Sequence, residues 1–253
     1  YEEGSNLPEL IVVFAFFFAS FVHTVTGFGS ALVGMPILVL GIGLEKSAPL
    51  LAILSQIVNL VVLWQNWKGL KWLESLILIL PSIFGVPLGL FLLKGENENI
   101  LNILLGVILV FHSIFLLFFE NKVSIIECSR WINYSLGIVA GFTAGILGGA
   151  YNANGPPVII YTSLFEKDKV GFRSTLQMFF VVNGLMIVAG HYLSGLISAE
   201  IWRLCLYGIP GLIGGTLVGL WVDKYITPNY FRIIVIVSIL ILGIILINQA
   251  IFW

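Results

Sequence analysis

Charged residues, cysteines and basic clusters are all scarce in this sequence, and each shortage excludes a class of protein. Only 10% of the 253 residues are Asp, Glu, Lys or Arg, whereas soluble globular domains carry about 25%. The formal net charge of −1 provides no basic field for a nucleic acid. The two cysteines, Cys128 and Cys205, do not have a metal-binding spacing. We therefore expect no nucleic-acid partner, no metal and no cofactor.

Apolar residues are instead abundant, because 59% of the chain is hydrophobic and the mean hydropathy is +1.06. A chain of this length cannot enclose so much apolar surface in an aqueous fold, whereas a lipid bilayer accommodates it. The 27 glycines and 9 prolines agree, since both are commoner in membrane helices than in soluble ones. The first ten residues lack the basic region of a signal peptide, so the first apolar segment is expected to be retained. The sequence predicts an all-α, polytopic membrane protein embedded in a lipid bilayer.

Six apolar segments have the length of about 20 residues that a helix needs to cross a bilayer. They span residues 47–66, 73–93, 100–119, 171–192, 200–222 and 230–251. Two further apolar stretches, 7–44 and 131–165, are 38 and 35 residues long, too long for one crossing. Small and polar residues interrupt them, as Gly-Phe-Gly-Ser at 27–30 and as Gly-Gly-Ala-Tyr-Asn-Ala-Asn-Gly-Pro-Pro at 148–157. We expect each stretch to be a broken or re-entrant helical segment that is followed by three full spans.

The two halves of the chain resemble each other in the order and spacing of their residues. Gln56 and Gln177 are 121 residues apart, and so are Pro36 and Pro157. Similar order with little identity is typical of an old internal duplication. We predict a first membrane repeat at 1–122 and a second at 131–253, which together form a single membrane domain.

The basic residues predict how these repeats are oriented. If each broken segment enters and leaves on one side, nine basic residues fall on one side of the membrane and three on the other. The nine are Lys68, Lys71, Lys122, Arg130, Lys167, Lys169, Arg173, Lys224 and Arg232, and the three are Lys46, Lys94 and Arg203. The positive-inside rule then predicts cytoplasmic basic loops, both termini outside, and two repeats that are inverted relative to each other.

The two breaks are the predicted substrate site. Backbone polar groups at mid-membrane must be satisfied inside the protein or along a wet cavity. A helix that starts there presents unpaired N–H groups and a positive dipole end, which suit a small anion. One helix is expected to start between Ser30 and Pro36, and another after Asn154, which can cap it. The candidate substrate-binding residues of the breaks are Gly27, Phe28, Gly29, Ser30, Pro36, Gly148, Gly149, Tyr151, Asn152, Asn154, Gly155, Pro156 and Pro157.

Polar residues inside the spans extend this candidate site. Gln56 and Asn59 share a helix face, and Gln177 is the repeat mate of Gln56; hydrogen bonding between helices is the alternative role for them. Arg173 precedes Gln177 by one helical turn and is placed to attract anions. No Asp or Glu lies deep in a span, which argues against a carboxylate proton relay. His23, four residues before the first break, is the candidate for proton coupling.

Three segments resemble motifs of the sulfite exporter TauE/SafE family. They are TGFGSALVGMPIL at 26–38, GGAYNANGPPVIIY at 148–161 and GFRSTLQ at 171–177. The resemblance covers essentially the whole chain and implies an integral membrane permease for sulfite, organosulfonates or related small anions. The first motif departs from the more glycine-rich family form at Ser30 and Ala31. The resemblance also implies a motif role for Gly27, Gly29, Pro36, Gly148, Gly149, Asn152, Asn154, Gly155, Pro156, Pro157, Arg173 and Gln177.

Together, the residues and the resemblance predict a secondary transporter that exports a small anion across the plasma (inner) membrane by alternating access. Sulfite or an organosulfonate is the expected substrate. An anion channel with the same cavity open to both sides is one alternative, and an importer of small sulfonates or carboxylates is another. An intramembrane enzyme is disfavoured, because Ser30 has no recognisable His or Lys partner and the sequence shows no acidic pair or metal cluster. A ligand-binding sensor without flux is a further alternative, which an additional soluble domain would favour.

Overall fold

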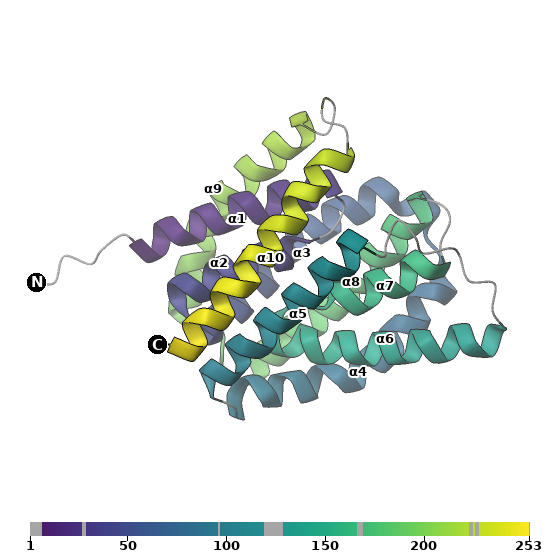
Figure 1. Ribbon diagram of the computed structural model, residues 1–253, viewed down its shortest axis with the longest axis horizontal. Helices are drawn as coiled ribbons and strands as arrows, with labels where there is room; N and C mark the ends of the chain where they lie inside the picture. Colours follow the sequence, from purple (N-terminus) through teal and green to yellow (C-terminus); the bar gives the residue numbers. More distant parts are fainter. Residues whose placement is uncertain are drawn as a thin grey trace, which may run out of the picture.

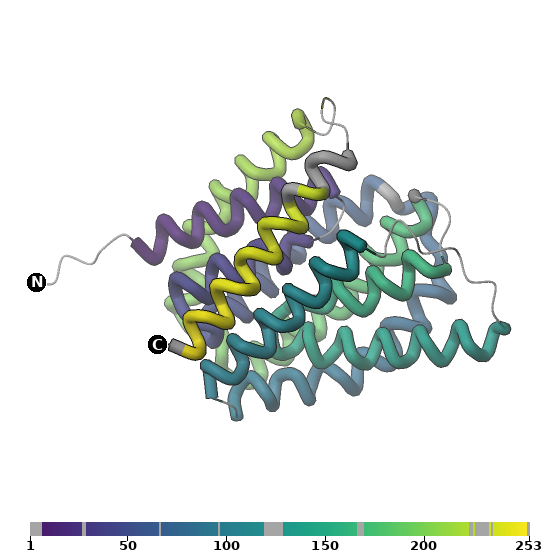
Figure 2. The backbone as a smooth tube through the Cα atoms, in the orientation of Figure 1, coloured from purple at the N-terminus to yellow at the C-terminus, as the bar shows by residue number. Residues whose placement is uncertain are grey.

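The computed structural model describes residues 7–26, 29–95, 97–118, 129–165, 169–222, 225 and 228–252, and over these residues all regular secondary structure is helical. Figure 1 shows the helices, and Figure 2 traces their order along the chain. They are α1 (Leu7–Thr26), α2 (Ser30–Ile42), α3 (Leu44–Asn66), the 3-10 turn η1 (Trp67–Gly69), α4 (Trp72–Gly95), α5 (Glu98–Phe118), α6 (Arg130–Tyr151), α7 (Gly155–Phe165), α8 (Lys169–Leu193), α9 (Ala199–Val222) and α10 (Pro228–Phe252).

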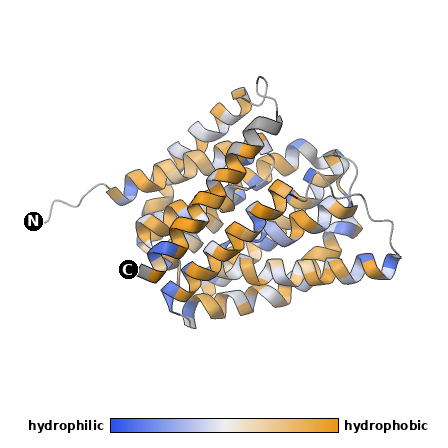
Figure 3. Cartoon of the chain, in the orientation of Figure 1, coloured by the Kyte–Doolittle hydropathy of each residue, from blue (hydrophilic) through white to orange (hydrophobic). Residues whose placement is uncertain are grey.

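Most of these helices are built to cross a membrane. Within the described residues, α1, α3, α4, α5, α6, α8 and α9 are long and apolar enough to span a bilayer. Large apolar side chains point outward from them; Phe84 and Phe91 of α4, for example, are 72% and 73% exposed. Figure 3 shows hydrophobic residues along most of each helix and hydrophilic ones gathered towards the helix ends. Exposure of this extent is expected against lipid rather than water, so the predicted all-α membrane fold is confirmed.

The six predicted spans correspond to α3, α4, α5, α8, α9 and α10, and their ends differ from the prediction by three residues or fewer. The two overlong stretches are each divided into a long helix and a short one, as predicted. Helices α2 and α7 have only 13 and 11 residues, about 20 and 17 Å at 1.5 Å per residue, too short to cross a bilayer core of about 30 Å.

Each long and short pair folds back as a hairpin. A Cβ atom on Gly41, near the end of α2, would overlap Ile11, near the start of α1. In the second half, the Tyr161 hydroxyl of α7 donates a hydrogen bond to Oδ1 of Asn133, in the first turn of α6, at 2.7 Å. Because the end of the short helix lies beside the start of the long one, both broken segments enter the bundle and return to the end from which they came.

The second break is shorter than predicted. Helix α6 continues through Tyr151 and α7 begins at Gly155, so only Asn152–Asn154 lie outside helices. The start of α7 directly after Asn154 agrees with the prediction, whereas Gly148–Tyr151, which were assigned to the break, are helical. Inside a bundle, continued helix satisfies the backbone hydrogen bonds of the glycines. The two prolines fit the first turn of α7, whose N–H groups have no acceptor within the helix.

Left-handed backbone marks both breaks. Asn152 has φ 52° and ends α6, where its N–H donates to the carbonyl oxygen of Gly148 at 2.8 Å. Gly29 has φ 94° and immediately precedes α2. Gly and Asn are the residues that tolerate this conformation, and α2 begins at Ser30, within the predicted interval.

Two pairs of helices pack with their backbones in contact. Helix α4 lies against α6, and α1 lies against α9. A Cβ atom on Gly89 of α4 would overlap the carbonyl oxygen of Ile146, and one on Gly211 of α9 would overlap that of Val13. If α1–α5 are matched in order with α6–α10, then α1 corresponds to α6 and α4 corresponds to α9. The α4–α6 pair therefore corresponds to the α9–α1 pair. This correspondence is the pattern expected of a duplicated unit packed around a two-fold axis.

We name the two ends of the bundle by residues that lie there. At the Leu7 end, where α1 begins and α10 ends (left in Figure 1), Glu9 of α1 pairs with Arg203 of α9, and Lys46 of α3 pairs with Glu200 of α9. At the Gly69 end, the Ser174 hydroxyl of α8 donates to the carbonyl oxygen of Gly69 at 2.7 Å.

Candidate functional site

A small cavity of about 30 Å³ lies where the two breaks meet. Five parts of the chain enclose it: the end of α1, the start of α2, the middle of α3, the break between α6 and α7, and the middle of α8. Its lining residues are His23, Gly29, Ser30, Ala31, Leu32, Ser55, Gln56, Asn59, Asn152, Asn154, Gly155, Phe180 and Gly184. Seven of these thirteen residues have polar side chains and none is Asp, Glu, Lys or Arg, so the cavity is polar and lined by uncharged groups.

The N-terminal ends of two short helices meet at this cavity. Ser30 is the first residue of α2 and Gly155 the first of α7, and both line the cavity. First-turn N–H groups have no acceptor within their own helix, and the helix dipole adds partial positive charge there. The two halves of the chain therefore contribute similar electropositive groups to one small space.

His23 links both halves of the chain at this position. The side-chain NH2 of Gln177 can only donate, so Nε2 of His23, 3.2 Å away, accepts. A neutral imidazole then carries its proton on Nδ1, which lies 3.0 Å from the hydroxyl oxygen of Ser30 and donates to it. The expectation that Ser30 has no histidine partner was therefore wrong, but in this arrangement the imidazole is a donor to the hydroxyl and not a base for it. A second proton on His23 would place two donors face to face, and the Gln177 amide would have to turn. His23 and Gln177 are both buried within the bundle.

Asparagines hold the second break in place. Nδ2 of Asn154 donates to Oδ1 of Asn183 in α8 at 2.6 Å, and Nδ2 of Asn152 donates to the Ser55 hydroxyl of α3 at 3.4 Å. Asn154 stands immediately before α7, where it was expected to cap the helix; the side-chain hydrogen bond that we observe joins it to α8 instead. The backbone of the break is thereby fixed from two helices, one in each half.

Helices α3 and α8 cross tightly at the cavity wall. A Cβ atom on Gly184 would overlap the side-chain amide of Gln56, so a larger residue at this crossing would displace that amide. Oε1 of Gln56 has no hydrogen-bond partner among the described residues. Asn59, one turn after Gln56, also lines the cavity. The predicted shared face of Gln56 and Asn59 thus points to the site.

The structure brings some predicted site residues to the cavity and leaves others away from it. Gly29, Ser30, Gln56, Asn59, Asn152, Asn154, Gly155 and His23 line it, and Gln177 reaches it through His23. Gly27 and Phe28 lie outside the described residues. The predicted residues that do not line the cavity are Pro36, Gly148, Gly149, Tyr151, Pro156, Pro157 and Arg173.

Packing explains the positions that lie away from the cavity. Gly149 lets α6 approach the backbone of Val86 in α4, and Tyr151 is buried in the hydrophobic core. Pro36 is buried inside α2. Arg173 lies one helical turn before Gln177 in α8 and does not line the cavity.

Several cavity residues were not predicted. They are Ala31, Leu32, Ser55, Phe180 and Gly184. Asn183 does not line the cavity, but it holds Asn154, which does. Phe180 and Gly184 follow Gln177 by three and seven residues and share its helix face, a spacing that would have indicated them. Ser55 and the contacts of Ala31 and Leu32 depend on how separate helices pack, which has no local signal.

Two broken helical hairpins that close on a buried polar cavity, within a lipid-exposed helical bundle, form the architecture expected of a multi-pass membrane transporter. Comparison with known proteins identifies the family of the chain. The family model of the sulfite exporter TauE/SafE family matches residues 12–246, and the chain belongs to this family. The membership that the three motifs predicted is therefore confirmed.

One curated relative extends this comparison. The chain is 23% identical over 206 residues to the "Probable sulfite/organosulfonate exporter TauE" of Cupriavidus necator. The aligned region covers 79% of this chain and 78% of the relative. No solved structure gives a significant match.

Proposed function

We propose that the protein is a secondary transporter that exports a small oxyanion, such as sulfite or an organosulfonate, across the plasma membrane by alternating access. The observation that carries this proposal is that both breaks line one buried polar cavity. Family membership and the name of the Cupriavidus necator relative support the substrate class. A cell interior at negative potential favours anion export by about 2.3 kcal/mol per charge per 100 mV.

The chemistry of the cavity supports an anion. Helix N-termini from both halves supply N–H donors, and the amides of Asn154 and Gln56 line the same space. Among the described residues that line the cavity there is no carboxylate, which would repel an oxyanion, and no lysine or arginine. A donor-rich, uncharged site suits an ion that must bind and then leave.

The size of the cavity supports a conformational change. Its volume of about 30 Å³ has room for about two water molecules, at roughly 10–15 Å³ for each, whereas sulfite has four heavy atoms. The site must therefore widen before it can accept a substrate. Rocking of one repeat against the other is the movement that broken-helix transporters use for this purpose.

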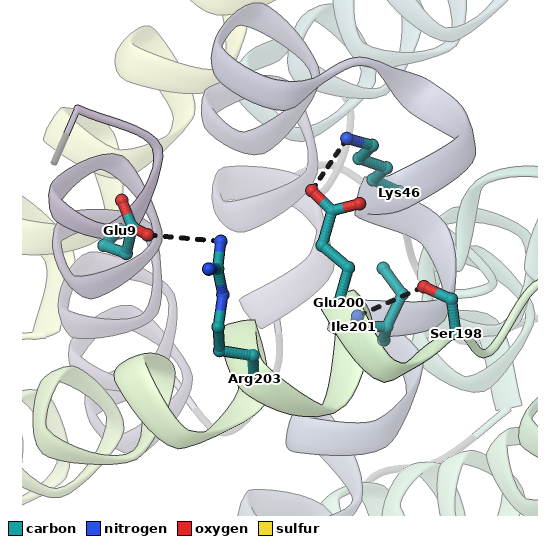
Figure 4. A network of polar contacts seen from close by, with 6 residues as sticks. All are labelled: Glu9, Lys46, Ser198, Glu200, Ile201 and Arg203. Atoms are coloured by element: carbon teal, nitrogen blue, oxygen red, sulfur yellow. Dashed lines mark hydrogen bonds and ion pairs between the residues drawn. The ribbon is translucent and has the colours of Figure 1, made fainter. Parts of the chain in front are cut away.

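Ion pairs between helices at the Leu7 end would keep that end closed in one state of the transport cycle. Lys46 Nζ lies 2.8 Å from Oε1 of Glu200, and the Arg203 guanidinium lies 3.4 Å from Oε1 of Glu9, as Figure 4 shows. Each pair joins an element of residues 1–122 to α9. Nζ of Lys94 also donates to the carbonyl oxygen of Ser194 at 2.8 Å.

Reversing one of these charges is expected to open this end. In Lys46→Glu the attraction to Glu200 becomes repulsion, and an exposed pair is worth about 0.2–1 kcal/mol. The measurement uses a cysteine introduced at Ser55, in a background without Cys128 and Cys205. We expect this cysteine to react with an impermeant maleimide added from the Leu7 side about two- to fivefold faster in Lys46→Glu than in the protein that keeps Lys46.

The charge-swapped double variant, Lys46→Glu with Glu200→Lys, is expected to restore the slow reaction. Lys68→Glu, at the Gly69 end, serves as the matched control and should leave the rate from the Leu7 side unchanged. Equal acceleration by the control and by Lys46→Glu would contradict a closure at this pair.

Counterflow separates a carrier from an anion channel. A carrier that returns loaded exchanges faster than one that returns empty, so liposomes preloaded with unlabelled sulfite are expected to take up labelled sulfite several times faster than empty ones. An uptake rate that is independent of preloading would favour the channel. Net import against an outward sulfite gradient would favour the importer.

A further inference from the structure

Helix α8 has one face that runs along its whole length and borders the cavity in the middle. The residues of this face are spaced by four, three, four, three and four positions, which keeps them on one side of an α-helix. They are Arg173, Gln177, Phe180, Gly184, Ile187 and His191, and we call them the α8 inner face.

Contacts show that this face points into the bundle. Gln177 bonds to His23, and Gly184 lines the cavity. Farther along, Ile187 is fully buried, and a Cβ atom on Gly148 would lie 2.7 Å from its Cδ1 atom. The α8 inner face therefore passes from the Gly69 end, past the cavity, towards the Leu7 end.

His191 is the last residue of this face, and its environment is unusual. It follows Gly184 by seven residues, which is roughly 10 Å farther along the helix axis. The residue is fully buried, and neither Nδ1 nor Nε2 has a hydrogen-bond partner among the described residues. The Cα–Cβ bond of a helical residue tilts towards the N-terminus of its helix, which for His191 is the direction of the cavity. Buried polar groups are nearly always hydrogen-bonded, so an unpartnered one calls for an explanation.

Positive charge lies beyond His191. Lys94 of α4 donates to the carbonyl oxygen of Ser194, and the N–H of Ser194 in turn donates to Gly190 at the end of α8. An anion that leaves the cavity along the α8 inner face towards the Leu7 end would meet His191 and then Lys94. In the opposite direction it would meet Gln177 and then Arg173, so each half of this route ends at a cation.

We infer that His191 is a second binding position for the transported oxyanion, between the central cavity and the Leu7 end; this inference rests on the proposed function. A neutral imidazole presents one N–H donor, which an oxyanion oxygen accepts. The oxyanion occupies this position while the Leu7 end is open. An intermediate position of this kind divides a long desolvated passage into two shorter steps.

The chain offers a matched control for this role. His112 of α5 is 1% exposed, and neither of its ring nitrogens has a hydrogen-bond partner among the described residues. It resembles His191 in burial and in chemistry, but it does not belong to the α8 inner face. Replacing either histidine with leucine removes an unpaired buried imidazole, so a purely structural effect should be similar in the two variants.

The test measures sulfite transport by purified variants in liposomes and sulfite binding to the same variants in detergent. We expect His191→Leu to lower the maximal transport rate at least tenfold while the dissociation constant for sulfite changes less than twofold. His191→Asn, which keeps a side-chain N–H donor, should retain at least a third of the wild-type rate. His112→Leu should stay within twofold of wild type.

Two results would overturn the inference. One is a wild-type rate in His191→Leu, and the other is an equal loss in His112→Leu. Should His191→Leu fail to insert, His191→Ala replaces it with the same expected loss relative to His191→Asn. Failure of wild-type protein to move any oxyanion would overturn the proposed function itself, and that result is distinct from a normal wild type with unaffected variants.

Discussion

Replacing Asn154 or Gln177 with alanine is expected to abolish transport while the protein still inserts and folds. Asn154 lines the cavity and is held by Asn183, and Gln177 sets the orientation of His23. A hydrogen bond to a charged group is worth about 1.5–3 kcal/mol, which corresponds to roughly 10- to 150-fold in rate. Loss of the side chain also releases its partner, so the combined effect should bring oxyanion flux in liposomes to background.

Two controls separate loss of the site from loss of the fold. Thr175 is a buried α8 residue on the face opposite Gln177, and its hydroxyl has no hydrogen-bond partner among the described residues. Asn133 accepts a hydrogen bond from Tyr161 far along α6 from the cavity. Thr175→Val and Asn133→Ala should transport within about twofold of wild type. Full activity in both Asn154→Ala and Gln177→Ala would refute the site.

A larger side chain at Gly89 is expected to separate α4 from α6. A Cβ atom there would overlap the carbonyl oxygen of Ile146 and approach the backbone of Gly149 and Ala150. Overpacking typically lowers the free energy of unfolding by about 1–3 kcal/mol. Backbone atoms cannot move aside as side chains can, so we expect Gly89→Val to lower it by about 3 kcal/mol or more. The measurement is the midpoint of thermal unfolding in detergent.

Gly95, at the end of the same helix, is the matched control because no other atom lies within 4 Å of an added Cβ. Gly95→Val should leave the midpoint of unfolding nearly unchanged. Equal stability of the two variants would show that α4 and α6 do not pack as closely as described.

The fold was largely predictable because lipid imposes a strong length and composition rule. Six spans were placed to within three residues of their helix ends, since each segment is apolar and bounded by charge. The two breaks were also located, because glycine, asparagine and proline gather there. The extent of the second break was not predictable: Gly148 and Gly149 have weak helix preference, but contact with α4 keeps them helical.

The candidate site was predictable only in part, because a cavity depends on how helices meet. His23 was expected near the first break, and its hydrogen bonds to Ser30 and Gln177 place it there. Nothing in the local sequence indicates that Ser55 faces Asn152, 97 residues away. Tyr151 illustrates the opposite error, since a polar aromatic residue beside the break packs into the core instead of the cavity.

Transport by purified protein in liposomes tests the proposed function most directly, with sulfite, sulfate, sulfonates and small carboxylates competing against one another. We expect sulfite or a sulfonate to move, to be inhibited by its chemical relatives, and to stop moving in Asn154→Ala. Failure of every oxyanion to move through the wild-type protein, while it remains folded and inserted, would contradict an anion transporter built around the two breaks.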